Sequence, residues 1–107
     1  MTGKYHDDPK ARGRLTIFPP TWSPRYLRPA VLAAVARYTE LARDNGLTPT
    51  QLALAWCYGR WCVASTIIGA TTLAQLKENI DAYEVQLSPE IIAAVDAIHA
   101  SVPNPGQ

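Results

Sequence analysis

The chain has 107 residues, 48% of them hydrophobic, and its 10 basic and 9 acidic residues give a formal net charge of +1. That length fits one ordinary domain with its own core. A charge this close to zero excludes the basic surface typical of proteins that bind nucleic acid or anionic membranes. No apolar run approaches the roughly 18 residues that a bilayer span needs, and the first residues lack the apolar region of a signal peptide. We therefore expect a cytoplasmic protein that binds neither nucleic acid nor membranes.

The sequence divides into three regions of different composition. Residues 1–28 show little periodicity and hold four prolines, at positions 9, 19, 20 and 24. Because proline removes a backbone donor and disfavours helix in the residue before it, this region is predicted to be an irregular loop. Residues 29–100 are predicted to form the helices and the one strand of the fold, and residues 101–107 a loose tail.

Two helices are predicted between Pro29 and Arg60. Apolar residues in the first recur at three- and four-residue spacing, at Val31, Leu32, Val35, Tyr38 and Ala42. Pro29 suits the first turn, and Gly46 suits the position after the helix end. Thr48-Pro49-Thr50-Gln51 then indicates an N-cap, a first-turn proline and a capping-box glutamine. The helix that follows is apolar on most sides, so it should be largely buried before it ends at Gly59 and Arg60.

Val63–Ile68 is the single convincing strand, since it is short, β-branched and apolar on both faces toward its end. Thr72 is predicted to cap a helix that runs to about Tyr83, and Ser88 to cap a last helix. A buried strand without neighbours would carry unsatisfied backbone groups. Either another chain pairs with this strand, or the chain is a piece of a larger sheet.

The two cysteines, Cys57 and Cys62, do not form a predicted metal site. Zinc needs four ligands, and the two histidines, His6 and His99, lie at opposite ends of the chain. Both cysteines have apolar neighbours in sequence, where a free thiol behaves as a small hydrophobe. No metal is expected, and His99 is interpreted as a partly exposed residue of the last helix.

The most informative segment is Ser65–Ile80, STIIGATTLAQLKENI. A strand that enters a helix through a glycine turn directs backbone N–H groups at one point, and the helix N-terminus attracts anions. Gln75, Glu78 and Asn79 stand at i, i+3 and i+4, so they share one helix face close to that N-terminus. This pattern favours a site for a phosphate-bearing ligand.

Four segments together resemble the aldo-keto reductases, closest to the branch that includes the Tas-type reductases and the potassium-channel β subunits. They are TGKY from Thr2, TPTQLALAWC, STIIGATTLAQLKENI and LSPEIIAAVDAIH, in the family's order. The family fold is a (β/α)8 barrel of about 250 residues. The resemblance therefore implies an α/β protein that is the C-terminal fragment of a TIM barrel, mostly helical, with one strand. The first 28 residues would be the loop after a barrel strand, and Val63–Ile68 the last barrel strand.

The resemblance also implies a cofactor, NADP(H), and a role for individual residues. The 2′-phosphate would contact Gly69, Thr71 and Gln75, and the adenine would bond Glu78 and Asn79. The other cofactor phosphates would lie near Lys4 and Arg14.

Each of these residues has a simpler interpretation that the sequence leaves open. Thr72 to Gln75 is itself a capping-box pattern, so Gln75 would then serve the backbone alone. Glu78 and Asn79 would form a solvated helix face, and Gly69 would serve only the turn geometry. Lys4 lies at the chain start, and the alignment of the loop around Arg14 is loose.

No catalytic residue is predicted. The family reduces carbonyls with an Asp, Tyr, Lys and His set on earlier barrel strands, and none of the four has a counterpart in this sequence. The expected function is therefore the NADP(H)-binding C-terminal part of an aldo-keto reductase, inactive alone, with the rest of the barrel as its partner. The alternative is a non-enzymatic helical module that self-associates, pairs its Val63–Ile68 strands between copies and binds little or no nucleotide.

Overall fold

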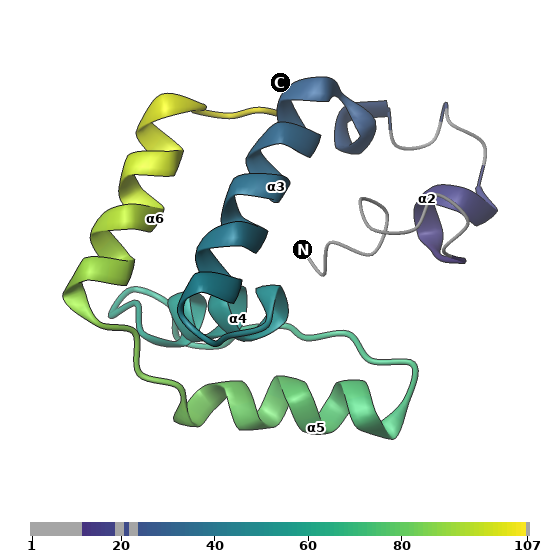
Figure 1. Cartoon of the computed structure of the whole chain (residues 1–107). Coiled ribbons are helices and arrows are strands. Elements are labelled where there is room, and N and C mark those ends of the chain that lie inside the picture. Colours follow the sequence, from purple (N-terminus) through teal and green to yellow (C-terminus); the bar gives the residue numbers. More distant parts are fainter. Residues whose placement is uncertain (1–11, 19–20, 22–23, 107) are drawn as a thin grey trace.

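A computed structural model describes residues 12–18, 21 and 24–106 (Figure 1). Every regular element in these ranges is helical, in the order α2 Arg14–Ile17, η2 Pro24–Leu27, α3 Pro29–Asp44, α4 Pro49–Tyr58, α5 Leu73–Asp81, η3 Ala82–Glu84 and α6 Pro89–Ser101, where η marks a 3₁₀ turn. The expectation of a mostly helical chain is confirmed. None of the described helices is long and apolar enough to cross a membrane.

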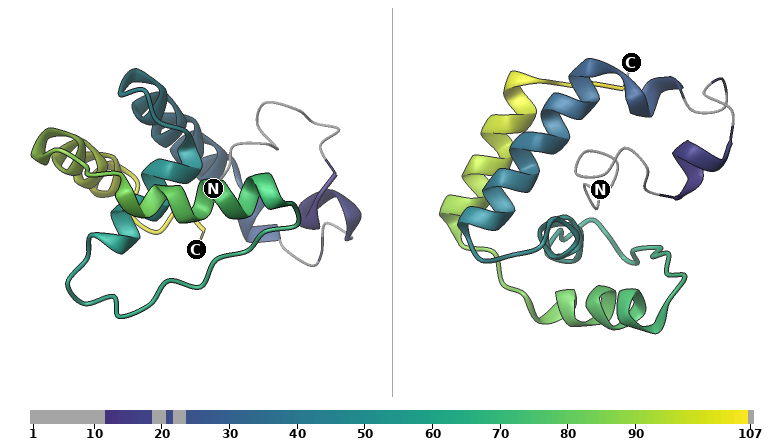
Figure 2. Two further views of the ribbon diagram at one scale, coloured as in Figure 1. Left: turned by 90° about the horizontal axis from the view of Figure 1, so that it is seen from below. Right: turned by 45° about the vertical axis from the view of Figure 1, so that its right-hand side comes forward.

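The helices form an open arrangement around α4. α3 and α6 run side by side, and α4 crosses below them (Figures 1 and 2). α5 packs on α4 from the side away from α3 and α6, and the long connection between α4 and α5 extends outward (Figure 2). α4 is therefore the element that joins the α3–α6 pair to the helix that carries most of the predicted site.

The starts and ends of α3 and α4 follow the local chemistry predicted from the sequence. α3 begins with Pro29 in its first turn and stops before Gly46, which adopts a left-handed φ of 69°. Such a φ suits glycine because it has no Cβ. At the start of α4, Thr48 Oγ1 accepts from Gln51 N at 3.1 Å, and Thr48 N donates to Gln51 Oε1 at 2.9 Å. This reciprocal pair completes the predicted capping box.

The two later helices also begin at the predicted caps. Thr72 Oγ1 accepts from Gln75 N, and Ser88 Oγ accepts from Ile91 N. The helix predicted to reach Tyr83 ends as an α-helix at Asp81 and continues as the 3₁₀ turn η3 to Glu84.

The predicted strand Val63–Ile68 is not formed, and this part of the prediction is wrong for the chain as it stands. The segment is irregular backbone, and no strand occurs in the part of the chain that the structure describes. A strand requires a hydrogen-bonded neighbour, and all described regular elements are helices. Ile67 in this segment is 99% exposed, so its side chain packs against no described part of the chain.

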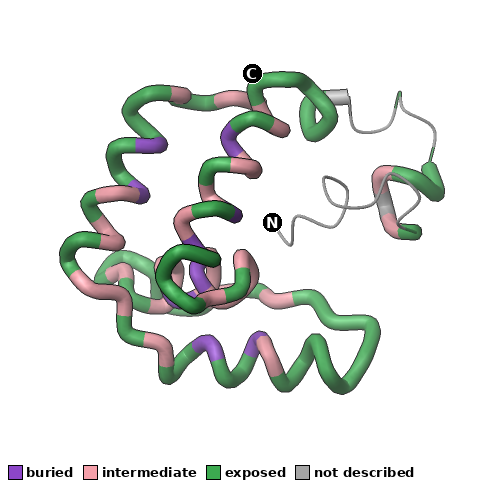
Figure 3. Tube along the Cα trace, viewed as in Figure 1, coloured by how far each residue is buried: buried purple, intermediate pink, exposed green. Residues whose placement is uncertain are grey.

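The core is small and lies where α3, α4 and α6 meet. It centres on Ala42, Leu52 and Val95, with partly buried neighbours at Tyr38, Leu41, Leu47, Trp56, Leu87 and Ile91 (Figure 3). In α4 only Leu52 and Ala55 are fully buried, so this helix is less buried than its composition predicts.

Large apolar side chains are exposed on the opposite side of the fold. α5 and η3 leave a stripe of them uncovered: Leu73, Leu76, Ile80 and Tyr83. Their spacing matches one side of a helix. α4 covers one face of α5, and Tyr83 of the stripe packs edge-on against the Tyr58 ring of α4.

Candidate functional site

The glycine turn before α5 is open to solvent. Gly69 is exposed, its φ is not in the left-handed region, and a Cβ built on it would meet nothing within 4 Å. The backbone therefore does not require glycine at this position. The interpretation in which Gly69 serves only the turn geometry gains no support from this conformation.

Thr71 and Gln75 meet at the N-terminus of α5. Gln75 Oε1 accepts from Thr71 N at 2.8 Å and from Thr71 Oγ1 at 2.9 Å. The capping box predicted for Thr72 and Gln75 forms only in part, because the Gln75 side chain returns to Thr71 instead of to the cap residue. Gln75 does satisfy a backbone donor, as the simpler interpretation expects. The exposed turn also gathers one N–H, one hydroxyl and one amide at a positive helix end.

Asn79 is buried and holds the turn in place. It is 6% exposed, and its Nδ2 donates to the carbonyl oxygen of Gly69 at 3.1 Å. Its own carbonyl oxygen accepts from Tyr58 Oη at 3.1 Å. The last carbonyl groups of a helix lack an N–H partner within the helix. The Asn79 carbonyl lies near the C-terminus of α5, and the Tyr58 hydroxyl donates to it. The interpretation of Asn79 as part of a solvated face does not fit this burial.

Glu78 is half-buried and reaches the start of α4. Thr48 Oγ1 donates to Glu78 Oε1 at 2.6 Å, a short hydrogen bond to a carboxyl group. Tyr58 and Thr48, at the two ends of α4, thus bind neighbouring residues of α5. Sequence reasoning identified Thr48 only as a helix cap and did not identify Tyr58. These contacts join residues 30 and 21 positions apart, and no local pattern predicts them.

The structure brings together five of the seven predicted cofactor residues on one turn and one helix: Gly69, Thr71, Gln75, Glu78 and Asn79. Lys4 lies outside the described residues. Arg14 begins the one-turn helix α2, and its side chain is not described. The cofactor roles of all seven stay predictions.

The described residues hold no cluster of three or more His, Cys, Asp or Glu that could bind a metal ion. Cys57 is partly exposed, Cys62 is exposed, and neither forms a disulfide. His99 is exposed on α6, in line with its interpretation as a surface helix residue.

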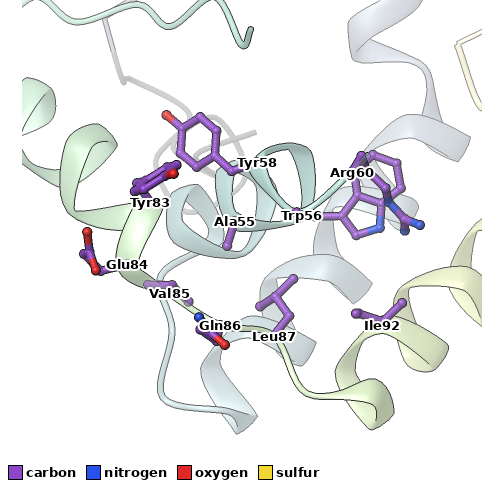
Figure 4. Close-up of a pocket in the computed structure, with 11 residues that line it drawn as sticks. Ala55, Trp56, Tyr58, Arg60, Tyr83, Glu84, Val85, Gln86, Leu87 and Ile92 are labelled. Carbon is purple, nitrogen blue, oxygen red and sulfur yellow. The ribbon is translucent and has the colours of Figure 1, made fainter. Parts of the chain in front are cut away.

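Two cavities lie away from the turn. A cleft of about 470 Å³ separates the end of α4 from the segment that joins α5 to α6, and at its edge the Arg60 guanidinium carbon lies 4.0 Å from the centroid of the Trp56 ring (Figure 4). A groove of about 530 Å³ lies between α3, α4 and α6, where Tyr38 and Val95 are among its mostly apolar lining residues. Burial raises the pKa of Tyr38 in that groove, with a smaller opposing effect from Arg37. Neither cavity is lined by a residue of the predicted site.

A glycine turn that opens a helix presents backbone N–H groups and a positive helix end, which together favour an anion. A sequence model described as "Aldo/keto reductase family" matches residues 2–100. The chain belongs to this family.

Individual relatives agree with that assignment. The chain is 42% identical over 100 residues to "Protein tas" of Escherichia coli K12, a match that covers 92% of this chain and 28% of that protein. It is 35% identical over 103 residues to a "Putative voltage-gated potassium channel subunit beta" of Schizosaccharomyces pombe, covering 92% and 30% respectively. A "Probable voltage-gated potassium channel subunit beta" of Arabidopsis thaliana is 36% identical over 75 residues, covering 68% and 23%. The chain therefore spans less than a third of the length of these relatives.

Proposed function

We propose that this chain is the NADP(H)-binding C-terminal portion of an aldo-keto reductase. In that role Val63–Ile68 becomes the last strand of a (β/α)8 barrel once the preceding strands lie beside it, α5 is the helix that follows it, and residues 1–28 are the loop region after the preceding barrel strand. Family membership and the 28–30% span of two relatives support this proposal. Location in the cytoplasm stays a prediction from the sequence.

The observation that carries the proposal is the exposed turn at the N-terminus of α5. Gly69 has open space in front of it, and the Thr71 N–H and hydroxyl both point to one acceptor, Gln75 Oε1. A phosphate oxygen is an acceptor of the same kind with more charge, and the helix end favours that charge. We assign the 2′-phosphate to this point. Glu78 and Asn79, on the same helix, then lie on the adenine side.

The chemistry of the family is hydride transfer from the nicotinamide to a carbonyl carbon, with a tyrosine as proton donor. No residue of this sequence matches the family's Asp, Tyr, Lys and His set. The contribution of this portion is binding energy at the far end of the cofactor, which positions the reactive ring without contacting it. Alone, the chain should show no reduction of aldehydes or ketones with NADPH above a blank without protein.

The preference for NADP(H) over NAD(H) is expected to be modest. α5 contains no arginine for a bidentate phosphate contact. Its one basic residue, Lys77, forms an ion pair with Asp81 at i+4 instead. The turn must therefore bind the phosphate mainly through N–H and hydroxyl donors.

The test is a chimera in which the part of E. coli tas that precedes the matched region is joined to this chain. Fluorescence titration should show tighter binding of NADPH than of NADH, and Thr71→Ala should reduce that difference by about fivefold, the effect of one hydrogen bond with a net contribution of about 1 kcal/mol. Thr71→Ser, which keeps both donors, is the matched control. Equal affinities for both cofactors, unchanged by Thr71→Ala and Gln75→Ala, would mean that these residues only build the turn and the cap.

The alternative, a self-associating helical module, has its own support in the uncovered stripe Leu73, Leu76, Ile80 and Tyr83. It makes a different prediction for the same experiment. A module of this kind gains no affinity for either cofactor when the rest of the barrel is supplied.

A further inference from the structure

The hydroxyl of Thr48 makes two hydrogen bonds that fix its direction. It accepts from Gln51 N at 3.1 Å, which caps α4, and it donates to Glu78 Oε1 at 2.6 Å. A hydroxyl has a single proton, so the whole donor capacity of this side chain is used on Glu78. The backbone N–H of Thr48 is itself held by Gln51 Oε1 at 2.9 Å. Thr48 is therefore a fixed point at which the Glu78 carboxyl group is bound.

We propose that Thr48 is a positioning residue that orients Glu78 to bind the amino group of adenine. This inference rests on the proposed function of the turn and helix, and adds to it a residue on a different helix. With Oε1 bound to Thr48, Oε2 is the oxygen assigned to the ligand. A carboxylate accepts several hydrogen bonds, so both contacts are compatible.

Two features of the fold make the fixed carboxyl group useful. Glu78 lies on α5, most of which is exposed, and a free glutamate side chain loses rotamer entropy when a ligand orders it. The bond to Thr48 orders it beforehand. The N-terminus of α4 also carries a partial positive charge, which favours a carboxylate beside it. The same helix holds the next residue, Asn79, through Tyr58 at its other end.

The experiment separates orientation of Glu78 from capping of α4. Thr48→Asn keeps a cap oxygen and supplies an N–H donor, whereas Thr48→Asp keeps the cap, has almost the same shape as the asparagine and cannot donate. The full chain is titrated by NMR with 2′,5′-ADP, which carries adenine and the 2′-phosphate, and separately with inorganic phosphate. The phosphate titration measures any direct repulsion between the anion and the carboxylate that Thr48→Asp introduces.

Thr48→Asp is expected to weaken 2′,5′-ADP binding by about tenfold more than it weakens phosphate binding, the size of one charge-assisted hydrogen bond. Thr48→Asn should remain within about twofold of the unmodified chain. Adding Glu78→Gln to Thr48→Asp places an amide donor opposite the aspartate, and this double variant should recover most of the lost affinity.

The outcomes distinguish this inference from the proposed function. If the unmodified chain binds 2′,5′-ADP and Thr48→Asp weakens both ligands equally or neither of them, Thr48 only caps α4 and the inference is overturned. If the unmodified chain binds no 2′,5′-ADP, the titration is repeated on the tas chimera, and absence of binding there contradicts the proposed function and the inference with it.

Discussion

Gly69 and Gly46 show how the same residue type serves different purposes in one short chain. Gly46 has a φ of 69°, which a side chain makes costly, whereas Gly69 has neither a left-handed φ nor a neighbour within reach of a Cβ. The sequence placed Gly46 just after a helix end, where a left-handed glycine is common, but it left open whether Gly69 serves the turn geometry or the ligand. The backbone conformation supplies the difference.

Gly69→Ala and Gly46→Ala are therefore expected to differ in their effects. Gly46→Ala should lower the free energy of unfolding by about 1–2 kcal/mol, the cost of a left-handed L-residue. Gly69→Ala should change it by less than about 0.5 kcal/mol, yet weaken 2′,5′-ADP binding because the methyl group fills the space in front of the turn. Thermal unfolding followed by circular dichroism measures the first quantity and NMR titration the second. Strong destabilisation by Gly69→Ala would show that the turn itself needs glycine.

Glu90, in the first turn of α6, provides a prediction for pH dependence. Hydrogen bonds from the Ser88 side chain and from the backbone N–H of Glu90 hold the pKa of Glu90 below its ordinary value of 4.5. A lowered folded-state pKa stabilises the fold above the unfolded-state pKa, and this contribution is lost as the pH falls through the folded-state pKa. An NMR titration should therefore give a Glu90 pKa below 4.5, and Ser88→Ala should raise it. Glu90→Gln keeps the Ser88 cap and should remove this titration step. A normal pKa for Glu90 would contradict the prediction.

Among the helices and strands, the features that the sequence predicted correctly depend on residues close to one another along the chain. Pro29, Thr48, Thr72 and Ser88 mark the starts of α3, α4, α5 and α6 because caps and first-turn prolines act locally. The prediction of a strand at Val63–Ile68 was wrong because a strand must pair with a second segment. β-Branched residues favour a strand but do not provide that partner. The contacts of α4 with α5 were not predictable either, since they join residues far apart in the sequence.

The sequence predicted all five residues on the turn and on α5 as site candidates. It did not predict the hydrogen bonds that they form. Helical spacing put Gln75, Glu78 and Asn79 on one face. It did not show that Gln75 would return to Thr71, or that Asn79 would be buried under the turn. Both contacts depend on how the connection before α5 folds back onto that helix.

Tyr58→Phe tests the connection between α4 and α5. The hydroxyl donates to the Asn79 carbonyl oxygen at 3.1 Å, and its loss leaves a partly buried acceptor near the end of α5. We expect a loss of about 1 kcal/mol in the free energy of unfolding and faster hydrogen exchange in the last turn of α5. Tyr83→Phe is the matched control, because Tyr83 is exposed and packs edge-on against the Tyr58 ring, with the ring centroids 5.8 Å apart. If Tyr58→Phe costs no more stability than Tyr83→Phe, the hydrogen bond to Asn79 does not hold the two helices together.

In the molecule as a whole, large apolar side chains are divided between a small core and the solvent-exposed surface. Its core is built from small residues and a few larger ones, whereas Ile67, Leu73 and Tyr83 are 99%, 85% and 72% exposed. Several large apolar side chains exposed in this way favour an interface with another chain or segment. This exposed apolar surface comprises the irregular segment before α5 and the stripe on α5 and η3. In the proposed barrel, the preceding strands would cover both.

The chain on its own is therefore expected to associate in solution. The segment Val63–Ile68, which has no strand partner among the described residues, and the stripe on α5 and η3 can each be buried against a second copy, through strand pairing and apolar contact. Light scattering coupled to gel filtration should give a mass above that of one 11.7 kDa chain. Leu73→Glu, which places an acidic residue in the first turn of α5 where the helix dipole favours it, should shift the distribution toward the monomer without loss of helix content. Ala70→Glu, on the same exposed connection but outside the apolar stripe, controls for added charge. A monodisperse monomer that unfolds cooperatively would show that the uncovered faces need no partner.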